Sequence, residues 1–193
     1  ASADDSTLNL TITNASGSAN NITIDANSNA DTTVNVGGTI GLTGTLHVGA
    51  NDGTATALFT ELTSTYGNID VNASNDATVS LDIATLSGDI TDFTVAADNS
   101  TIDVTTSNNG SDDIVNITNL TATASLGSDV AISLDGNTTF VNGSEDFADI
   151  LASADDSTLN LTITNASGSA NNITIDANSN ADTTVNVGGT IGL

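Results

Sequence analysis

The stretch LNLTITNASGSANNITIDANSNADTTVNVGGTIGLTGTLHV, residues 8–48, decides the fold. Its apolar residues stand two apart in short groups, and members at Leu10, Ile22, Val34 and Leu46 follow one another in steps of 12 residues. Alternation of apolar and polar residues is typical of a strand with one buried face. The groups are separated by Asn, Asp, Gly and Ser, which favour turns. The stretch therefore predicts short strands joined by tight turns at a regular spacing.

The same alternation runs through the rest of the chain. It recurs at Ile69 and Val71; Val79, Leu81 and Ile83; Phe93 and Val95; Ile102 and Val104; Val115 and Ile117; and Val130, Ile132 and Leu134. Helical periodicity is confined to residues 57–62 and 147–154, and both segments are too short to carry an architecture. The chain has four Phe, one Tyr and no Trp, so its core must be aliphatic. We predict an all-β protein.

Residues 1–42 return letter for letter as residues 152–193, with an offset of 151. The chain is therefore one complete repeat unit, residues 1–151, followed by the start of the next, residues 152–193. No Gly/Ser-rich or Pro-rich linker separates Leu151 from Ala152. Exact repetition indicates an array. An array gains length with each unit, whereas an enzyme gains nothing from restarting, so we expect a structural protein and no enzyme.

Two all-β architectures fit this spacing. In a β-solenoid, or parallel β-helix, two strands and their turns make one coil, and the tandem repeats add coils to one stack. In the alternative, β-sandwich units are linked by donor-strand exchange, with Leu159, Leu161 and Ile163 donated to a neighbouring sheet edge. The absence of Pro and the Gly-rich corners favour the solenoid. Seven coils per unit, at about 4.8 Å each, would make it about 34 Å long.

The charged side chains of the chain are all acidic at neutral pH. The chain has 22 Asp, 2 Glu, no Lys and no Arg, for a formal net charge of −24. Such a surface repels nucleic acid, whose phosphates need Lys or Arg partners. No apolar run reaches the length of a membrane span. The partners that we expect are neighbouring repeats or identical subunits of a filament, covalent glycans and metal cations.

Two stretches carry a family resemblance. Residues 67–74, GNIDVNAS, and residues 100–105, STIDVT, resemble the coils of haemagglutinin-type β-helix adhesins and other tandem-repeat surface proteins of microbes. The resemblance implies a secreted, surface-attached or fibre-forming protein, and it supplies no catalytic residues.

The unit is rich in acceptor sequences for N-glycosylation. Asn9 and Asn116 each stand between two inward-facing apolar residues, so their side chains should point to solvent, where a glycan would leave the core intact. The alternative is that these Asn residues serve only turns and strand faces. The sequence predicts acceptors at Asn9, Asn14, Asn21, Asn72, Asn99, Asn109, Asn116, Asn119, Asn137 and Asn142, and in the second copy at Asn160, Asn165 and Asn172.

One segment resembles half of a calcium loop. Asp25, Asn27, Asn29 and Asp31 place oxygen ligands at alternate positions, as Ca²⁺ sites do, but Ala30 replaces the expected Gly and no bidentate Glu follows. An Asx-rich turn is the alternative. We therefore expect no cofactor, with calcium as the one open candidate.

No catalytic arrangement is evident in the sequence. His47 is the sole His, and its place between Leu46 and Val48 predicts an outward-facing surface residue. No Ser has the setting of a nucleophile. We therefore expect an extracellular or cell-surface structural subunit of an acidic, glycosylated filament, stalk or surface layer. The alternative is the repeat stalk of a calcium-dependent or carbohydrate-binding adhesin.

Overall fold

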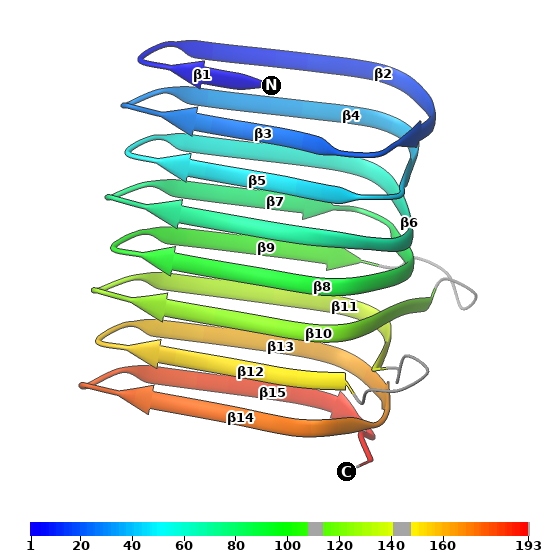
Figure 1. The fold of residues 1–193 in the computed structure, drawn as a ribbon, viewed down its shortest axis with the longest axis vertical. Coiled ribbons are helices and arrows are strands. Elements are labelled where there is room, and N and C mark those ends of the chain that lie inside the picture. The colour runs from blue at the N-terminus through cyan, green and yellow to red at the C-terminus, as the bar shows by residue number, and fades with distance from the viewer. Residues whose placement is uncertain (108–113, 141–147, 193) are drawn as a thin grey trace.

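The computed structural model, which describes residues 1–107, 114–140 and 148–192, is a β-solenoid of about seven turns (Figure 1). Every pairing between its described strands is parallel, as stacked coils require. The solenoid prediction is confirmed, and the antiparallel sandwich alternative is wrong. No helix occurs in the described part of the chain: residues 57–62 lie in a strand, and so do residues 148–154.

Fifteen strands make up the stack. Their bounds are β1 Ser2–Asp4, β2 Thr7–Ala19, β3 Ile22–Asn27, β4 Asp31–Leu42, β5 Thr45–Asn51, β6 Thr54–Ser74, β7 Thr78–Ile83, β8 Leu86–Asp98, β9 Thr101–Ser107, β10 Ile114–Ser125, β11 Asp129–Phe140, β12 Ala148–Asp155, β13 Thr158–Gly168, β14 Ala170–Asn178 and β15 Asp182–Gly189.

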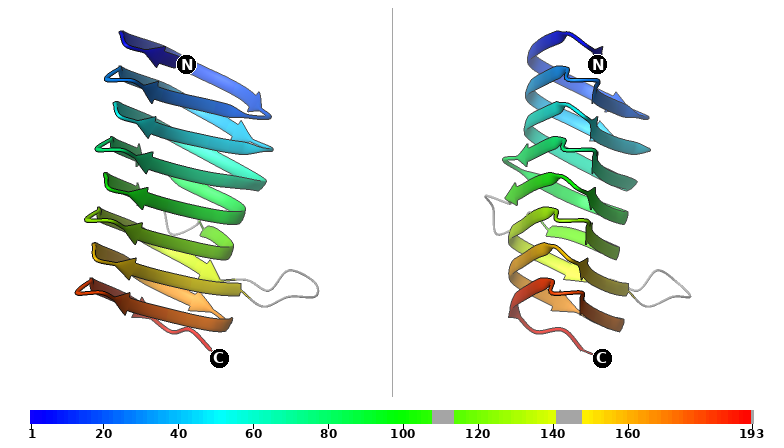
Figure 2. Two further views of the ribbon diagram at one scale, coloured as in Figure 1. Left: turned by 60° about the vertical axis from the view of Figure 1, so that its left-hand side comes forward. Right: turned by 90° about the vertical axis from the view of Figure 1, so that its left-hand side faces the viewer.

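Each coil has two long sides and one short side (Figure 2). The first sheet contains β1, β3, β5, the later parts of β6, β8 and β10, then β12 and β14. The second sheet contains the beginnings of β2, β4, β6 and β11, the strands β7 and β9, and the beginnings of β13 and β15. Long strands such as β4 bend from the second sheet onto the short side. Gly38 makes this bend possible, because its φ is +102° and a Cβ there would lie 2.2 Å from the Ala15 carbonyl oxygen.

The pairing of equivalent residues in successive coils shows how many coils one repeat unit contains. On the second sheet, equivalent positions in successive coils are Thr7, Asp31, Thr54, Thr78, Thr101, Asp129, Thr158 and Asp182. The path from Thr7 to its copy Thr158 therefore takes six steps, and the last two, through Asp129, are the longest. The sequence-based figure of seven coils is wrong, because seven coils in 151 residues would leave fewer than 22 residues for each, and even the shortest step, from Asp31 to Thr54, takes 23. Six coils span about 29 Å.

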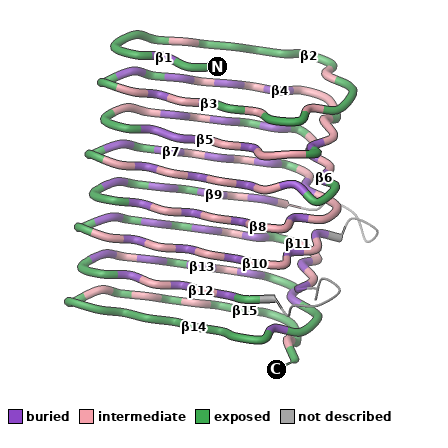
Figure 3. The backbone as a smooth tube through the Cα atoms, in the orientation of Figure 1, coloured by how far each residue is buried: buried purple, intermediate pink, exposed green. Residues whose placement is uncertain are grey.

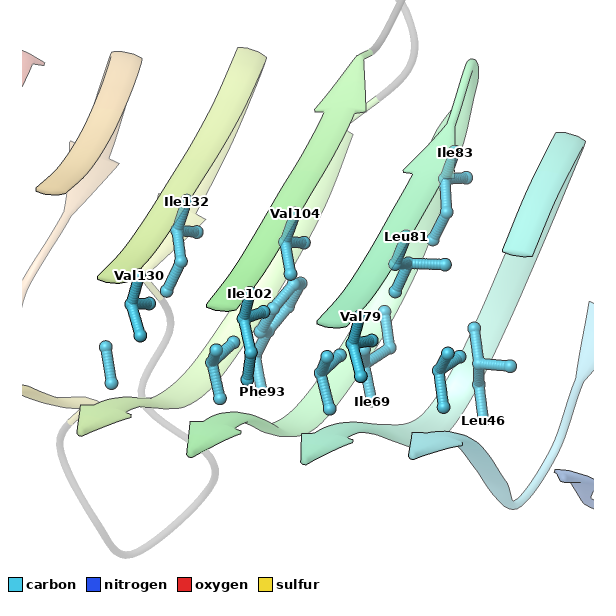
Figure 4. Close-up of a cluster of buried hydrophobic side chains, with 14 of the residues drawn as sticks. Leu46, Ile69, Val79, Leu81, Ile83, Phe93, Ile102, Val104, Val130 and Ile132 are labelled. Carbon is cyan, nitrogen blue, oxygen red and sulfur yellow. The ribbon is translucent and has the colours of Figure 1, made fainter. Parts of the chain in front are cut away.

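Aliphatic side chains fill the space between the two sheets. Leu46, Ile69 and Phe93 succeed one another along the first sheet, and Val79, Ile102 and Val130 along the second. Between the sheets, Ile69 lies beside Val79 and Phe93 beside Ile102 (Figure 4). All six are buried, and burial alternates along nearly every inner strand (Figure 3). Apart from the end coils, the predicted apolar positions in the described residues are the buried ones.

The corner between the sheets also carries polar groups inside the stack. Ser100, Ser128 and Ser157 occupy equivalent buried positions in successive coils. The Ser128 amide donates to Ser157 Oγ at 3.0 Å, and the Ser100 amide donates to Ser128 Oγ at 3.1 Å. Each hydroxyl in turn donates to a carbonyl oxygen of its own turn. The ladder satisfies amides that the turn would otherwise leave buried without a partner.

Candidate functional site

The surfaces on which coils stack are the first candidate functional site. The two copies of the duplicated segment have the same register: Thr7 pairs with Asp31 as Thr158 pairs with Asp182, and Ser2 pairs with Asp25 as Ser153 pairs with Asp176. The unit boundary between Leu151 and Ala152 falls inside β12, which pairs with β10 and β14 along its length. The second unit thus continues the stack of the first, in phase and without a joint.

Burial of the two copies depends on which surface of the segment has a neighbour. Leu10 in the first coil is 38% exposed, whereas its copy Leu161 is fully buried between Ile132 and Val185. At the opposite end the relation reverses, since Ile24 is 1% exposed and its copy Ile175 is 50% exposed. Identical sequence is therefore buried only where coils stand on both sides of it.

A second candidate lies on the outer face of the first sheet, where His47 bridges three coils. His47 Nδ1 lies 2.9 Å from Asp70 Oδ2, and Nε2 lies 3.3 Å from Asp25 Oδ1. Asn72 donates its amide to Asp70 Oδ1 at 2.7 Å. A Cβ at Gly49 would lie 2.7 Å from His47 Nε2, so Gly49 leaves the space that the ring occupies. We call Asp25, His47 and Asp70 the His47 clamp.

The clamp alters the protonation of its members. The hydrogen bond to Asp70 raises the pKa of His47, against the opposing effect of burial, and the charges of Asp70 and Asp25 add to the increase. The hydrogen bond from His47 lowers the pKa of Asp70, and the Asn72 amide contributes in the same direction. Both side chains are about one third exposed, so solvent screens the pair. The arrangement favours imidazolium between two carboxylates, which ties neighbouring coils together.

Asn and Thr serve elsewhere as donors to carboxylates. Down one column of the first sheet follow Asp92, Asn119, Asp149 and Asn172. Asn119 Nδ2 donates to Asp92 Oδ1 at 2.9 Å, and Asn172 Nδ2 donates to Asp149 Oδ1 at 3.0 Å. Because Asn is neutral, the column brings no two carboxylates together in adjacent coils.

This separation of carboxylates extends over the described strands. Among the registers of those strands, no Asp or Glu is paired directly with another acidic residue. Within the strands, carboxylates in one column are therefore at least two coils apart, about 9.6 Å, which is close to the screening length at physiological salt. In the turns, by contrast, Asp52 and Asp76 belong to adjacent coils. The placement limits charge repulsion along the stack.

The structure sorts the predicted glycosylation residues by their surroundings. Asn9, Asn14, Asn21, Asn99, Asn160, Asn165 and Asn172 are exposed; Asn72, Asn116, Asn119 and Asn137 are half-buried; and Asn109 and Asn142 lie outside the described residues. Asn116 faces outward as expected, but its amide donates to Asp89 Oδ1 at 2.7 Å. Asn99 donates likewise to Asp76, and Asn165 to Asn137. Asn9 and Asn160 lie on the outer face of the second sheet.

The residues of the candidate calcium loop lie on both sides of one corner. Asp25 and Asn27 belong to the outer face of β3, Asn29 is in the turn with a φ of 62°, and Asp31 begins β4 in the second sheet. Asp25 is directed to His47 instead. In the described ranges, no three His, Cys, Asp or Glu side chains are grouped as a metal site would require. The copy at Asp176, Asn178, Asn180 and Asp182 spans the equivalent corner.

An open groove of about 390 Å³ runs over the first four coils, where the second sheet bends onto the short side. Ile12, Val36, Leu58 and Phe59 contribute apolar surface, and Asp82 is the only acidic side chain of its lining. A single carboxylate without a base or nucleophile beside it offers no acid–base pair.

No protein-family profile, curated protein or solved structure matches the chain. Within the residues that the structure describes, no helix is long and apolar enough to cross a membrane.

Sequence reasoning placed His47 outward, which is confirmed, but it missed the partners of this residue. Asp25 precedes His47 and Asp70 follows it, each at a sequence distance close to one coil. Once the coil length is known, this spacing places Asp70 in the column of His47, and Asp25 two residues further along the same face of the neighbouring coil. The available signal was thus the repeat of two strand steps, applied to polar as well as apolar positions.

Proposed function

We propose that this chain is part of the shaft of an extracellular, acidic, β-rich filament, stalk or surface layer. The observation that carries the proposal is the common register of the two copies of the 42-residue segment. Each further unit would add six coils in phase and lengthen the stack by about 29 Å.

Load along such a shaft is carried by main-chain hydrogen bonds. The parallel ladders run from coil to coil, and the unit boundary lies within β12, so no flexible joint interrupts them. Solenoid repeats contact chiefly their immediate neighbours, and stability grows with the number of stacked interfaces. A chain built this way is suited to extension and not to closing around a substrate.

The outer surface suits a shaft that stands apart from its neighbours. One unit carries 20 of the 24 acidic residues, because four lie in residues 152–193. Over about 29 Å this is about one charge per 1.4 Å, a higher axial density than that of duplex DNA. Repulsion between shafts follows directly, and glycans on exposed Asn side chains such as Asn160 would add a steric barrier.

The length of the shaft tests the proposal. A chain extended by one further copy of the 151-residue unit is compared with the chain of 193 residues by small-angle X-ray scattering and electron microscopy. We expect the maximum dimension to increase by about 29 Å at unchanged cross-section. An extension in which the inward Leu, Ile and Val are replaced by Ser is the control, and it should add no rigid length. Two separate particles joined by a tether would refute the proposal.

Glycosylation is tested separately. The protein from its native source, or from a host with an N-glycosylation system, is measured by intact mass before and after enzymatic removal of N-glycans. We expect a loss of mass that is reduced by the variant Asn160→Gln. A native protein whose mass equals that of the bare chain would remove the glycan coat from the proposal and leave the shaft.

A further inference from the structure

We propose that residues 152–193 of one copy of this chain bind a second copy by taking the place of its residues 1–42. The inference goes beyond the proposed shaft, because it concerns how separate chains join. The partner is identified by sequence: the two segments agree in all 42 positions.

The structure already contains the junction that this exchange would form. Residues 31–42 stack on β6, with Asp31 beside Thr54 and Asn35 beside Leu58, and β3 stacks on β5. Residues 182–192 carry the same sequence as residues 31–41, and β14 includes the copy of β3. Placed on β6 and β5 of a second copy, they would repeat the pairings of residues 31–41 with β6 and of β3 with β5.

The exchange also supplies the His47 clamp of the second copy. Asp176 is the copy of Asp25 and would stand beside His47 of the second copy, in the place that Asp25 leaves. Ile175, which is half exposed in the single chain, would be covered as its copy Ile24 is. The junction would therefore have the same contacts as the one between residues 1–42 and the next coil in the single chain.

The free energy of exchange is the balance between the coils that are released and the interface that is gained. In a linear stack, stability is close to a sum of unfavourable terms for each coil and favourable terms for each interface between coils. Exchange releases the two coils of residues 1–42 together with their two interfaces and gains one interface at the junction. It is therefore favoured where the unfavourable terms of the two released coils exceed the favourable term of the one interface lost on balance. The segment that is released, residues 1–42, begins with the coil that has no neighbour on one side, where Leu10 and Ile12 are exposed. Exchange of an identical element is a low-cost route to association.

Engineered disulfides test the proposal in the full chain, which contains no Cys. Asn186 and Leu58 belong to the same column but lie five coils, about 24 Å, apart in one chain, too far for a disulfide. In the exchanged pair, Asn186 of one copy lies beside Leu58 of the other. The double variant Asn186→Cys with Leu58→Cys should therefore form covalent dimers and longer chains on oxidation, with peptides 58 and 186 linked.

Control variants distinguish the exchanged pair from pairing within one chain, from random coupling and from end-to-end contact. Asn35→Cys with Leu58→Cys should close within one chain and stay monomeric, because these residues are already paired. Each single Cys variant reports random coupling. The double variant Thr11→Cys with Asn186→Cys would cross-link only if intact stacks met end to end, because Thr11 lies in the first coil and Asn186 in the last. We expect no cross-link from this pair. Cross-linking of that pair, or a 58–186 variant that yields no more dimer than the single variants, would overturn the proposal. Neither result would decide the proposed function, which is tested separately by the length that one further unit adds to the shaft.

Discussion

Leu10 and Leu161 have the same sequence neighbours but differ in coil neighbours, which makes their replacement by Ala an internal test of the stack. Leu161 is fully buried between Ile132 and Val185, whereas Leu10 is 38% exposed and pairs with Val34 alone. Truncation of a fully buried Leu leaves a cavity and costs about 3 kcal/mol. At Leu10 the transfer term of three carbons, about 2.4 kcal/mol, is reduced by the exposed fraction to about 1.5 kcal/mol, with no enclosed cavity.

The measurement is urea unfolding followed by circular dichroism, together with amide exchange in residues 7–19 and 158–168. Amide hydrogen exchange is needed because a terminal coil can open without unfolding of the whole chain. We expect Leu161→Ala to lower the free energy of unfolding by about 1.5 kcal/mol more than Leu10→Ala. The pair Ile24→Ala and Ile175→Ala is the control, and its order should reverse, because there the first copy is the buried one. Costs near zero for both Leu161→Ala and Ile175→Ala would mean that the second copy hangs free of the stack, and would refute the reasoning.

Three further predictions concern charge and strain. The pKa of His47 in the folded chain is raised above its ordinary 6.5. The stability that the clamp adds is therefore complete below pH 6.5 and is lost as the pH rises through the pKa of the folded chain. The pKa of Asp70 is lowered, so its contribution to stability is lost only below its ordinary pKa of 3.8. The difference in urea midpoint between the native chain and His47→Gln should therefore be larger at pH 5 than at pH 8, and a difference independent of pH would count against the clamp. With a net charge of −24 and no Lys or Arg, the chain should be stabilised by cations that gather around its carboxylates, so the melting temperature should rise as NaCl is raised from about 10 mM to about 150 mM. Melting that is indifferent to both salt and chelator would contradict this stabilisation by cations. Leu126 is exposed with a φ of 56°, so Leu126→Asn should stabilise the chain by about 1 kcal/mol in the same assay, and a loss of stability would show that the Leu side chain makes a needed contact.

Much of the fold could be predicted because its signals are local. The alternation at Val79, Leu81 and Ile83, and the regular step from Leu10 to Leu46, state which side chains face inward and how long a side of the coil is. The number of coils per unit was harder to predict. The coils differ in length: the step from Thr78 to Thr101 is 23 residues, whereas the step from Asp129 to Thr158 is 29, and the 12-residue strand spacing accounts only for the shorter kind.

The candidate sites could be predicted only in part. Asn9 and His47 were placed on outer faces from their immediate neighbours, and the structure agrees. The clamp was missed because Asp25 and Asp70 are distant in sequence and meet His47 only through the register of β3, β5 and β6. The Asp–Asn column from Asp92 to Asn172 was missed for the same reason.

The sequence by itself determined the strand class, the aliphatic core, the uniform negative charge and the duplication, because each of these depends on residue type and spacing alone. Only the tertiary structure decided which residues lie next to one another across coils, and whether a given Leu is buried. Leu10 and Leu161 show the physical reason: burial needs a neighbour above and below, and the 42 identical residues have different neighbours at the two ends of the stack.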